Sequence, residues 1–227
     1  MSVQAVAKTS AGAAAYADKT AAYFVGARAD FCAKLPANPD ARILEIGSGS
    51  GETAALIKAA GKCGYYAGVE LFADAARQSE DRIDTVLVGD AATVPLAFPD
   101  GHFDALILSE VLEHLADPWA VLRRVAPLIK RGGLVLASSP NVAHWRVLRT
   151  IASGDFRHEA SGVFDRTHLR WFTPKTFAKL FEDTGFAIET LGPVTPFAAR
   201  TRAISKLTGG RLDYLFMTQI MIAGRKV

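Results

Sequence analysis

The sequence contains few cysteines and no long apolar run. Its 227 residues include only Cys32 and Cys63, which are too few for a disulfide framework and stand in no C-x-x-C or Cys/His cluster, so we expect no metal site. No stretch of about 18 apolar residues lacks a charge or a helix breaker, and the Ala-rich start carries Lys8, Asp18 and Lys19 in place of an apolar signal segment. These absences predict a cytoplasmic protein with no membrane span.

The sequence also lacks a strong excess of charge of either sign, with a net charge of +3. Residues 1–140 hold 13 Lys and Arg against 16 Asp and Glu, whereas residues 141–227 hold 13 against 7. A solvated basic surface and a binding face for an anionic acceptor are both consistent with the basic second part. Because no dense Lys/Arg block and no nucleic-acid motif occurs, we expect no nucleic-acid partner.

The length and composition predict a single domain. A chain of 227 residues, of which 50% are hydrophobic, can bury one sizeable core. We expect residues 1–40 to form a helical cover, residues 41–140 a cofactor-binding half and residues 141–227 an acceptor half. No pattern in the sequence indicates the oligomeric state.

The most informative stretch is Ala41–Thr53, which reads A-R-I-L-E-I-G-S-G-S-G-E-T. Branched apolar residues up to Ile46 predict a buried strand, and Glu52–Ala60 reads as a helix. The glycines between them permit a tight turn and a close approach of a ligand to the backbone. Strand, glycine turn and helix together predict a cofactor-binding unit.

The spacing of the glycines argues against a dinucleotide. The usual fingerprint needs a third glycine where this chain has Glu52, and a carboxylate is a poor neighbour for a pyrophosphate. A Tyr-x-x-x-Lys pair, which would favour an NAD-dependent oxidoreductase, is also missing.

Further strands alternate with helical segments along the next 90 residues. We predict strands at Gly64–Glu70, Asp84–Gly89, Phe103–Ser109 and Leu134–Ser138, with a helix from Pro118 to about Leu128. This alternation is typical of a Rossmann-like, doubly wound, mostly parallel sheet with helices on both faces, and its ligands bind beyond the carboxyl ends of the strands.

Two acidic residues end predicted strands where a nucleoside would lie. Glu70 follows the glycine turn by about 20 residues, where a carboxylate binds ribose hydroxyls. Asp90, beside the amide of Ala91, suits the exocyclic amine and a ring nitrogen of adenine, although a turn-forming role for this Asp is an alternative.

The remaining segments are less regular. Residues 1–40 read as two helical pieces that end before Leu35-Pro36, and within them Arg28 is able to pair with a carboxylate in a forked manner. After the fifth strand we expect a helix at Val142–Ser153, a long polar loop at Gly154–Trp171 and a capped helix at Thr173–Thr184. A strand at Phe186–Leu191, a basic insertion at Pro193–Gly210 and a closing strand at Leu215–Ala223 should follow.

The E-x-G-x-G-x-G pattern, Glu70, Asp90 and the later S-E-V-L-E-H-L together resemble the class I S-adenosylmethionine-dependent methyltransferases over about residues 20–227. P-D-G-H-F-D, S-S-P-N-V-A-H-W and F-D-R-T-H-L-R-W-F-T resemble more closely a bacterial branch found alone or fused to glycosyltransferases, often near polysaccharide genes. This resemblance implies a seven-stranded sheet whose last strand is antiparallel and inserted beside the fifth. We expect S-adenosylmethionine to be bound by Tyr23, Arg28, Glu45, Gly47, Ser48, Gly49, Gly51, Glu70, Leu71, Asp90, Ala91, Ser109 and Glu110.

We expect O-methylation of a sugar or another small polar acceptor, which requires a group to remove the hydroxyl proton. His168, with Asp165 as its orienting partner, is the first candidate; His114, His144 and the absence of any protein base remain alternatives. The substrate contacts that we expect are Asn141, Arg166 and Arg170, the arginines only for an anionic acceptor. An N- or carboxyl-methyltransferase and a non-catalytic cofactor-binding module remain alternative functions.

Overall fold

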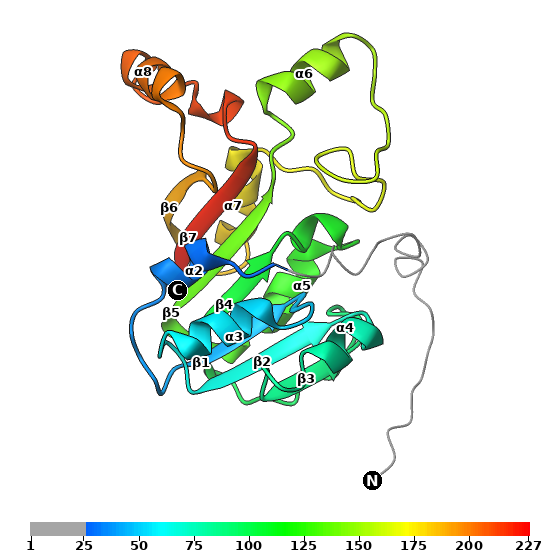
Figure 1. The fold of residues 1–227 in the computed structure, drawn as a ribbon, viewed down its shortest axis with the longest axis vertical. Coiled ribbons are helices and arrows are strands. Elements are labelled where there is room, and N and C mark those ends of the chain that lie inside the picture. Colours follow the sequence, from blue (N-terminus) through cyan, green and yellow to red (C-terminus); the bar gives the residue numbers. More distant parts are fainter. Residues whose placement is uncertain (1–25) are drawn as a thin grey trace.

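The structure, a computed structural model, describes residues 26–227. Seven strands form one sheet in the order β3-β2-β1-β4-β5-β7-β6 (Figure 1), with β1 Arg42–Ile46, β2 Tyr65–Glu70, β3 Thr85–Val88, β4 Phe103–Ser109, β5 Ile129–Pro140, β6 Phe186–Pro193 and β7 Gln219–Lys226. Strands β1 to β5 pair in parallel, whereas β7 is antiparallel to both β5 and β6. The predicted fold class, with its antiparallel last strand beside the fifth, is therefore confirmed.

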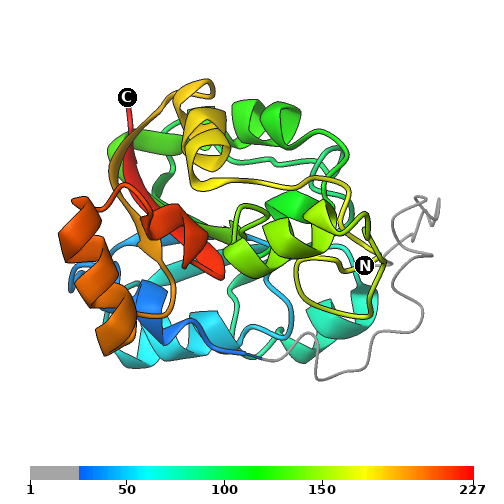
Figure 2. The same cartoon turned by 90° about the horizontal axis from the view of Figure 1, so that it is seen from above.

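Helices cover both faces of the sheet. Figure 2 shows α2 Ala29–Lys34, α3 Glu52–Ala59 and α4 Ala73–Gln78 on one face, and α5 Pro118–Val125 and α7 Pro174–Glu182 on the other. Each helix turns an apolar stripe to the sheet, as Val121, Leu122 and Val125 of α5 do. Because the central strands are covered on both faces, they are almost continuously apolar, and Ile43, Leu44 and Ile46 of β1 are fully buried.

The remaining helices lie beyond the carboxyl ends of the parallel strands. Helix α6 Trp145–Ala152 follows β5, and α8 Ala199–Thr208 lies between β6 and β7; both extend above the sheet in Figure 1. The predicted irregular loop Gly154–Trp171 connects α6 to α7 at the same end, and it contains no helix or strand. Within residues 26–227, no helix has the length and apolar character needed to cross a bilayer.

Three predicted boundaries were wrong, each for a different local or long-range reason. Strand β5 begins at Ile129 rather than at Leu134, because residues 130–133 continue it, and its pairing with β4 shifts register there. The last strand begins at Gln219 rather than Leu215, since residues 213–215 form a short 3₁₀ helix. Helix α6 begins at Trp145 rather than Val142, because Asn141 folds the chain into a turn by accepting the amide of Ala143.

The N-terminal prediction is tested only in part. Helix α2 agrees with the second of the two predicted helical pieces, which ends before Pro36. The first piece, including Tyr23, lies outside the described residues.

Candidate active site

A cavity of about 580 Å³ opens at the carboxyl ends of β1, β2, β3 and β4. The expected cofactor residues that line it are Glu45, Gly47, Ser48, Gly49, Glu70, Leu71, Asp90, Ala91, Ser109 and Glu110. Gly51 and Arg28 do not line it directly: Gly51 begins α3 behind the loop, and Arg28 contacts the lining residue Ser109. Chain segments that are far apart in sequence therefore meet at the edge of the sheet where a parallel fold binds ligands.

The glycine loop adopts a conformation that other residues rarely reach. Gly47, Gly49 and Gly51 have φ angles of +77°, +53° and +80°. The loop is fastened to β2, because Gly47 donates its amide to the Val69 carbonyl at 2.8 Å. The Gly49 amide points the same way and donates to Glu70 Oε2 at 2.8 Å, so the acid and the loop form one wall of the cavity.

The cavity is acidic. Its lining, as far as residues 26–227 describe it, contains six carboxylates, those of Glu45, Glu52, Glu70, Asp90, Glu110 and Asp117, and neither lysine nor arginine. Such a lining repels a pyrophosphate and suits a ligand with positive groups.

Burial opposes the negative charge at two of the carboxylates, because it favours their neutral forms. Burial raises the pKa of Glu45 to about 8, although the Tyr66 hydroxyl donates to its Oε2 at 2.8 Å. Burial also raises the pKa of Glu70, against the stabilising amides of Phe72 and Gly49. Each group is therefore costly to ionise on its own, and a cationic ligand would stabilise its charged form.

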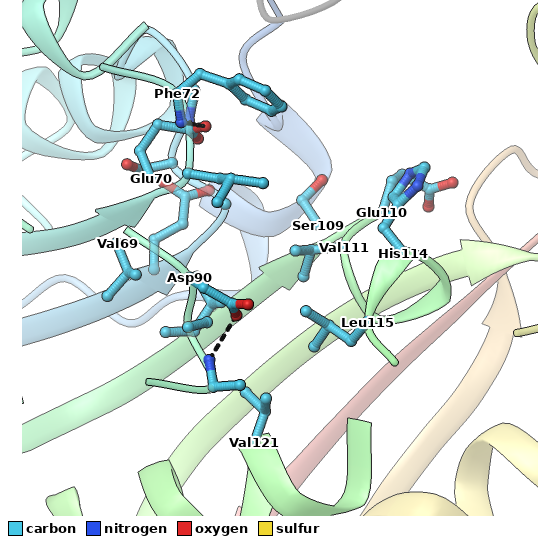
Figure 3. A pocket seen from close by; sticks show the side chains of 18 of the residues that line it. Val69, Glu70, Phe72, Asp90, Ser109, Glu110, Val111, His114, Leu115 and Val121 are labelled. Carbon is cyan, nitrogen blue, oxygen red and sulfur yellow. Dashed lines mark hydrogen bonds between the residues drawn. The ribbon is translucent and has the colours of Figure 1, made fainter. Parts of the chain in front are cut away.

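Figure 3 shows Glu70 and Phe72 on one side of the cavity and Glu110 and His114 on the opposite side. Glu110 has a φ of +50°, the only positive φ among the non-glycine residues described. Its Oε2 accepts the side-chain amide of Gln219 at 3.0 Å, which links the cavity to β7. Backbone strain at a cavity wall is typical of functional positions.

Arg28 fastens the segment before α2 to this wall. Its guanidinium forms a forked pair with Asp30, at 2.8 and 2.6 Å, and also donates to the hydroxyls of Ser109 and Ser138. Arg28 thus pairs with a carboxylate, as the sequence suggested, and that carboxylate is Asp30 of the same chain. Burial opposes the ionisation of Asp30, but the Arg28 partner outweighs it and lowers the pKa of that carboxyl.

The two leading histidine candidates lie together. The rings of His114 and His168 contact edge to face, with centroids 4.7 Å apart. His114 lines the cavity, and His168, which is 8% exposed, lies behind it. Nδ1 of His168 is held by the Val163 carbonyl at 3.1 Å, while Oδ1 of the expected orienting acid, Asp165, accepts the amide and hydroxyl of Thr167.

The other predicted residues occupy varied positions. His144 caps α6 through its Nδ1 and is absent from the cavity lining. Asn141 is fully buried, and its side chain donates to the carbonyls of Tyr214 and Met217, so it fastens the end of β5 to the segment before β7. Arg166 and Arg170 are exposed in the loop, where Arg170 donates to the Ala116 carbonyl.

Asp90 forms a turn as well as lining the cavity, since its Oδ1 accepts the Ala92 amide at 2.8 Å (Figure 3). The turn-forming alternative is thus present, and Asp90 lines the cavity as well.

Sequence reasoning missed the apolar walls and three acids, of which Glu52 and Asp117 line the cavity. Phe72, Val111, Leu115, Val121 and Leu169 line the cavity, but hydrophobic residues carry no signal that separates a wall from the core. Glu113, fully buried beside the histidines, is the second acid of S-E-V-L-E-H-L and was overlooked.

The fold and the cavity define the architecture of a class I methyltransferase. A solved S-adenosylmethionine-dependent methyltransferase from Archaeoglobus fulgidus superposes with a TM-score of 0.62 at 23% identity, over 90% of this chain and 96% of that one. This similarity concerns the fold.

Sequence comparison identifies the family. A sequence model described as a methyltransferase domain matches residues 17–191, so the chain belongs to this family. S-adenosylmethionine is the cofactor that the family uses, as predicted.

Two relatives are named for small-molecule O-methylation. The chain is 30% identical to the 27-O-demethylrifamycin SV methyltransferase of Amycolatopsis mediterranei, over 44% of this chain and 38% of that protein. It is 32% identical to a ubiquinone biosynthesis O-methyltransferase of Xanthomonas campestris pv. campestris, over 50% of this chain and 49% of that one. These matches span half or less of each relative's length, and the closer resemblance to a polysaccharide-associated bacterial branch stays a prediction.

Proposed function

We propose that this protein transfers a methyl group from S-adenosylmethionine to a hydroxyl of a sugar or another small polar acceptor. The observation that carries the proposal is the acidic cavity beside the glycine loop, whose carboxylates suit a sulfonium and an ammonium group and oppose a pyrophosphate. The family membership and the relatives named as O-methyltransferases support the same reaction.

The two walls of the cavity suggest how the ligand is held. On the Glu70 side, the carboxylate would accept hydrogen bonds from ribose hydroxyls, while Phe72 and Leu71 offer apolar surface to a nucleoside. Asp90 and Ala91 would bind the adenine edge. On the opposite side, Ser109 and Glu110 would face the amino-acid part of the cofactor, with Arg28 behind them to hold that wall in place.

When bound, S-adenosylmethionine supplies a methyl group already activated by its sulfonium. The protein then has to align the acceptor, exclude water and manage one proton. His114 lines the cavity on the side of Glu110, and His168 contacts it from behind. We therefore assign to this histidine pair the removal of the proton from the acceptor hydroxyl. We propose that the loop Gly154–Trp171, which carries His168, Arg166 and Arg170, acts as a lid and contacts the acceptor.

Charge and shared motifs favour one class of acceptor. The basic character of residues 141–227 favours an anionic saccharide, and the motifs shared with the polysaccharide-associated branch favour the same class of acceptor. We also propose that the protein acts in the cytoplasm, where S-adenosylmethionine is available. N-methylation and carboxyl methylation are the alternatives. A carboxylate or a neutral amine needs a base less than a hydroxyl does.

Two measurements test this function. Calorimetry should show binding of S-adenosylhomocysteine and little binding of NAD to the purified protein. A screen with labelled methyl donor should then show transfer to a hydroxylated acceptor, with sugars, nucleotide sugars, phenols, amines and carboxylic acids as parallel arms. Tighter binding of NAD would refute the cofactor assignment, whereas transfer only to amines or carboxylates would refute O-methylation. If the protein binds the cofactor but neither transfers its methyl group nor slowly hydrolyses it, a non-catalytic binding module would be favoured.

A further inference from the structure

A cluster of three potential metal ligands lies at the wall of the cavity. Glu113, His114 and His168 each place one ligand atom within 4.8 Å of the others. Glu113 and His114 come from the short 3₁₀ helix after β4, and His168 comes from the loop before α7. The function proposed above uses the two histidines but leaves Glu113 without a role.

The carboxyl group of Glu113 is unusually placed for a buried acid. The residue is 1% exposed, and its Oε2 receives one hydrogen bond, from Ser139 Oγ at 3.2 Å. Its Oε1 is buried with no hydrogen-bond partner among the described residues, and the same is true of Oε1 of Glu110. An unpartnered buried acceptor costs about 1–3 kcal/mol and needs an explanation.

The imidazoles are oriented as metal-binding histidines usually are. Nδ1 of His114 lies 3.2 Å from the Thr167 carbonyl, and Nδ1 of His168 lies 3.1 Å from the Val163 carbonyl. A carbonyl only accepts, so these contacts are hydrogen bonds when Nδ1 carries the proton, and in that neutral tautomer Nε2 carries the lone pair; Thr167 Oγ1 also lies 3.1 Å from Nδ1 of His114. A backbone carbonyl that fixes the tautomer in this way is the common support of a histidine ligand.

The backbone holds the two halves of the cluster together. The amides of Leu169 and Arg170 both donate to the Glu113 carbonyl, at 2.8 and 3.0 Å. The loop is therefore attached to the 3₁₀ helix at the residues next to the ligands, and the three side chains are brought together before any ion arrives. A preorganised set of ligands lowers the entropic cost of binding.

We propose that Glu113, His114 and His168 bind one divalent transition-metal cation, such as Zn²⁺ or Mn²⁺. Two imidazoles and a carboxylate form a ligand set that these ions accept, and three protein ligands leave positions open for a further oxygen. The sequence suggested no metal because His168 lies more than 50 residues from the other two ligands, outside any short spacing motif.

The site gives the cation a role that rests on the function proposed above. His114 lines the cavity, so a cation bound by it would lie at the wall that an acceptor in the cavity would reach. A hydroxyl oxygen bound to the cation loses its proton at a lower pH, and that proton passes to water at the mouth of the cavity. In this arrangement the histidine pair would promote loss of the acceptor proton through the cation that it binds, rather than by accepting the proton itself.

Direct binding of Zn²⁺ and Mn²⁺ to the protein tests the site without reference to catalysis. Protein stripped with a chelator and desalted would be titrated with Mn²⁺, following the loss of the free-ion signal by electron paramagnetic resonance, and with Zn²⁺ in competition with a chromophoric chelator. We expect one equivalent per chain and a rise in melting temperature. Glu113→Gln and His168→Ala should weaken binding by at least about tenfold, whereas His158→Ala, an exposed histidine of the same loop, should bind as the wild type does.

The outcomes separate the metal site from the proposed function. Stripped wild-type protein that is folded and binds S-adenosylhomocysteine, yet shows saturable binding of neither ion, overturns the metal site and leaves the methyltransferase proposal intact. Equal metal affinity in the wild type and in Glu113→Gln also overturns the metal site. Glu113→Gln is nearly isosteric, so it tests the site even if His168→Ala does not fold. Metal binding without cofactor binding would support the site and refute the proposed function.

Discussion

Replacement of Glu45 by glutamine should change how the stability of this protein depends on pH. Glu45 lies in β1 below the glycine loop, is 2% exposed, and receives a hydrogen bond from Tyr66. Burial raises its pKa from an ordinary value of 4.5 to about 8. Between those two pH values the folded protein keeps the proton that the unfolded chain releases.

The sign follows from this difference in bound protons. Where the folded state holds more protons, stability falls as pH rises, so the contribution of Glu45 is complete below about pH 4.5 and is lost by about pH 8. At about 1.4 kcal/mol for each pKa unit, the full change is on the order of 3–5 kcal/mol. Glutamine keeps an oxygen that can accept from Tyr66 and does not titrate. The stability of Glu45→Gln relative to the wild type should therefore rise by that amount from pH 5 to pH 8.

Urea denaturation of both proteins without ligand, at intervals between pH 5 and pH 9, measures the difference. The other buried acids are common to both chains, so their titration largely cancels. Tyr66→Phe provides a second check, because loss of the hydroxyl donor should push the pKa of Glu45 higher and extend the decline to higher pH. A stability difference between Glu45→Gln and wild type that stays constant over this range would refute the assignment of a protonated, buried Glu45.

Three further substitutions test the site. Glu70→Ala should weaken S-adenosylhomocysteine binding by about 1.5–3 kcal/mol, the value of hydrogen bonds to a charged group, and unchanged affinity by calorimetry would exclude the ribose role. Gly49→Val should fold but fail to bind the cofactor, whereas Gly61→Ala, also at positive φ but facing open space, should lose stability and bind normally; normal binding by Gly49→Val would reduce the loop to a structural turn. His168→Ala should lower kcat about 10²–10⁴-fold with little change in cofactor affinity, and full turnover by the folded variant would remove His168 from the proton-handling group.

The parts of the fold that the sequence predicts well are those specified by neighbouring residues. The strand, glycine turn and helix at residues 42–59 form a local unit, and the capping residue Thr173 marks the start of α7 without any information from the rest of the chain. The starts of β5 and β7 were predicted poorly, because they are set by distant partners: Ile129 pairs with Phe103 of β4, and Gln219 pairs with Pro140 of β5.

The same distinction applies to the site. Residues at strand ends, such as Glu70 and Asp90, follow from the topology and line the cavity as expected. The contact between His114 and His168, and the position of Glu113 beside them, depend on how the loop before α7 folds back. Asn141 stands at a strand end as well, yet its side chain turns into the protein and binds backbone, a choice that no spacing reveals.

The position of β7 has a consequence for biosynthesis. Strand β7 lies between β5 and β6 and provides the only partner of β6 in the described sheet. During translation, β5 leaves the ribosome before β7, which pairs with its second edge. Strand β7 becomes available only after residues 141–218 have followed β5 out of the ribosome. Until then, one edge of β5 and the whole of β6 expose unpaired backbone groups, the kind of surface that other nascent chains can extend by strand addition. We therefore expect the yield of soluble protein to depend on the rate of synthesis, and truncation before Gln219 to give aggregates rather than a smaller folded protein.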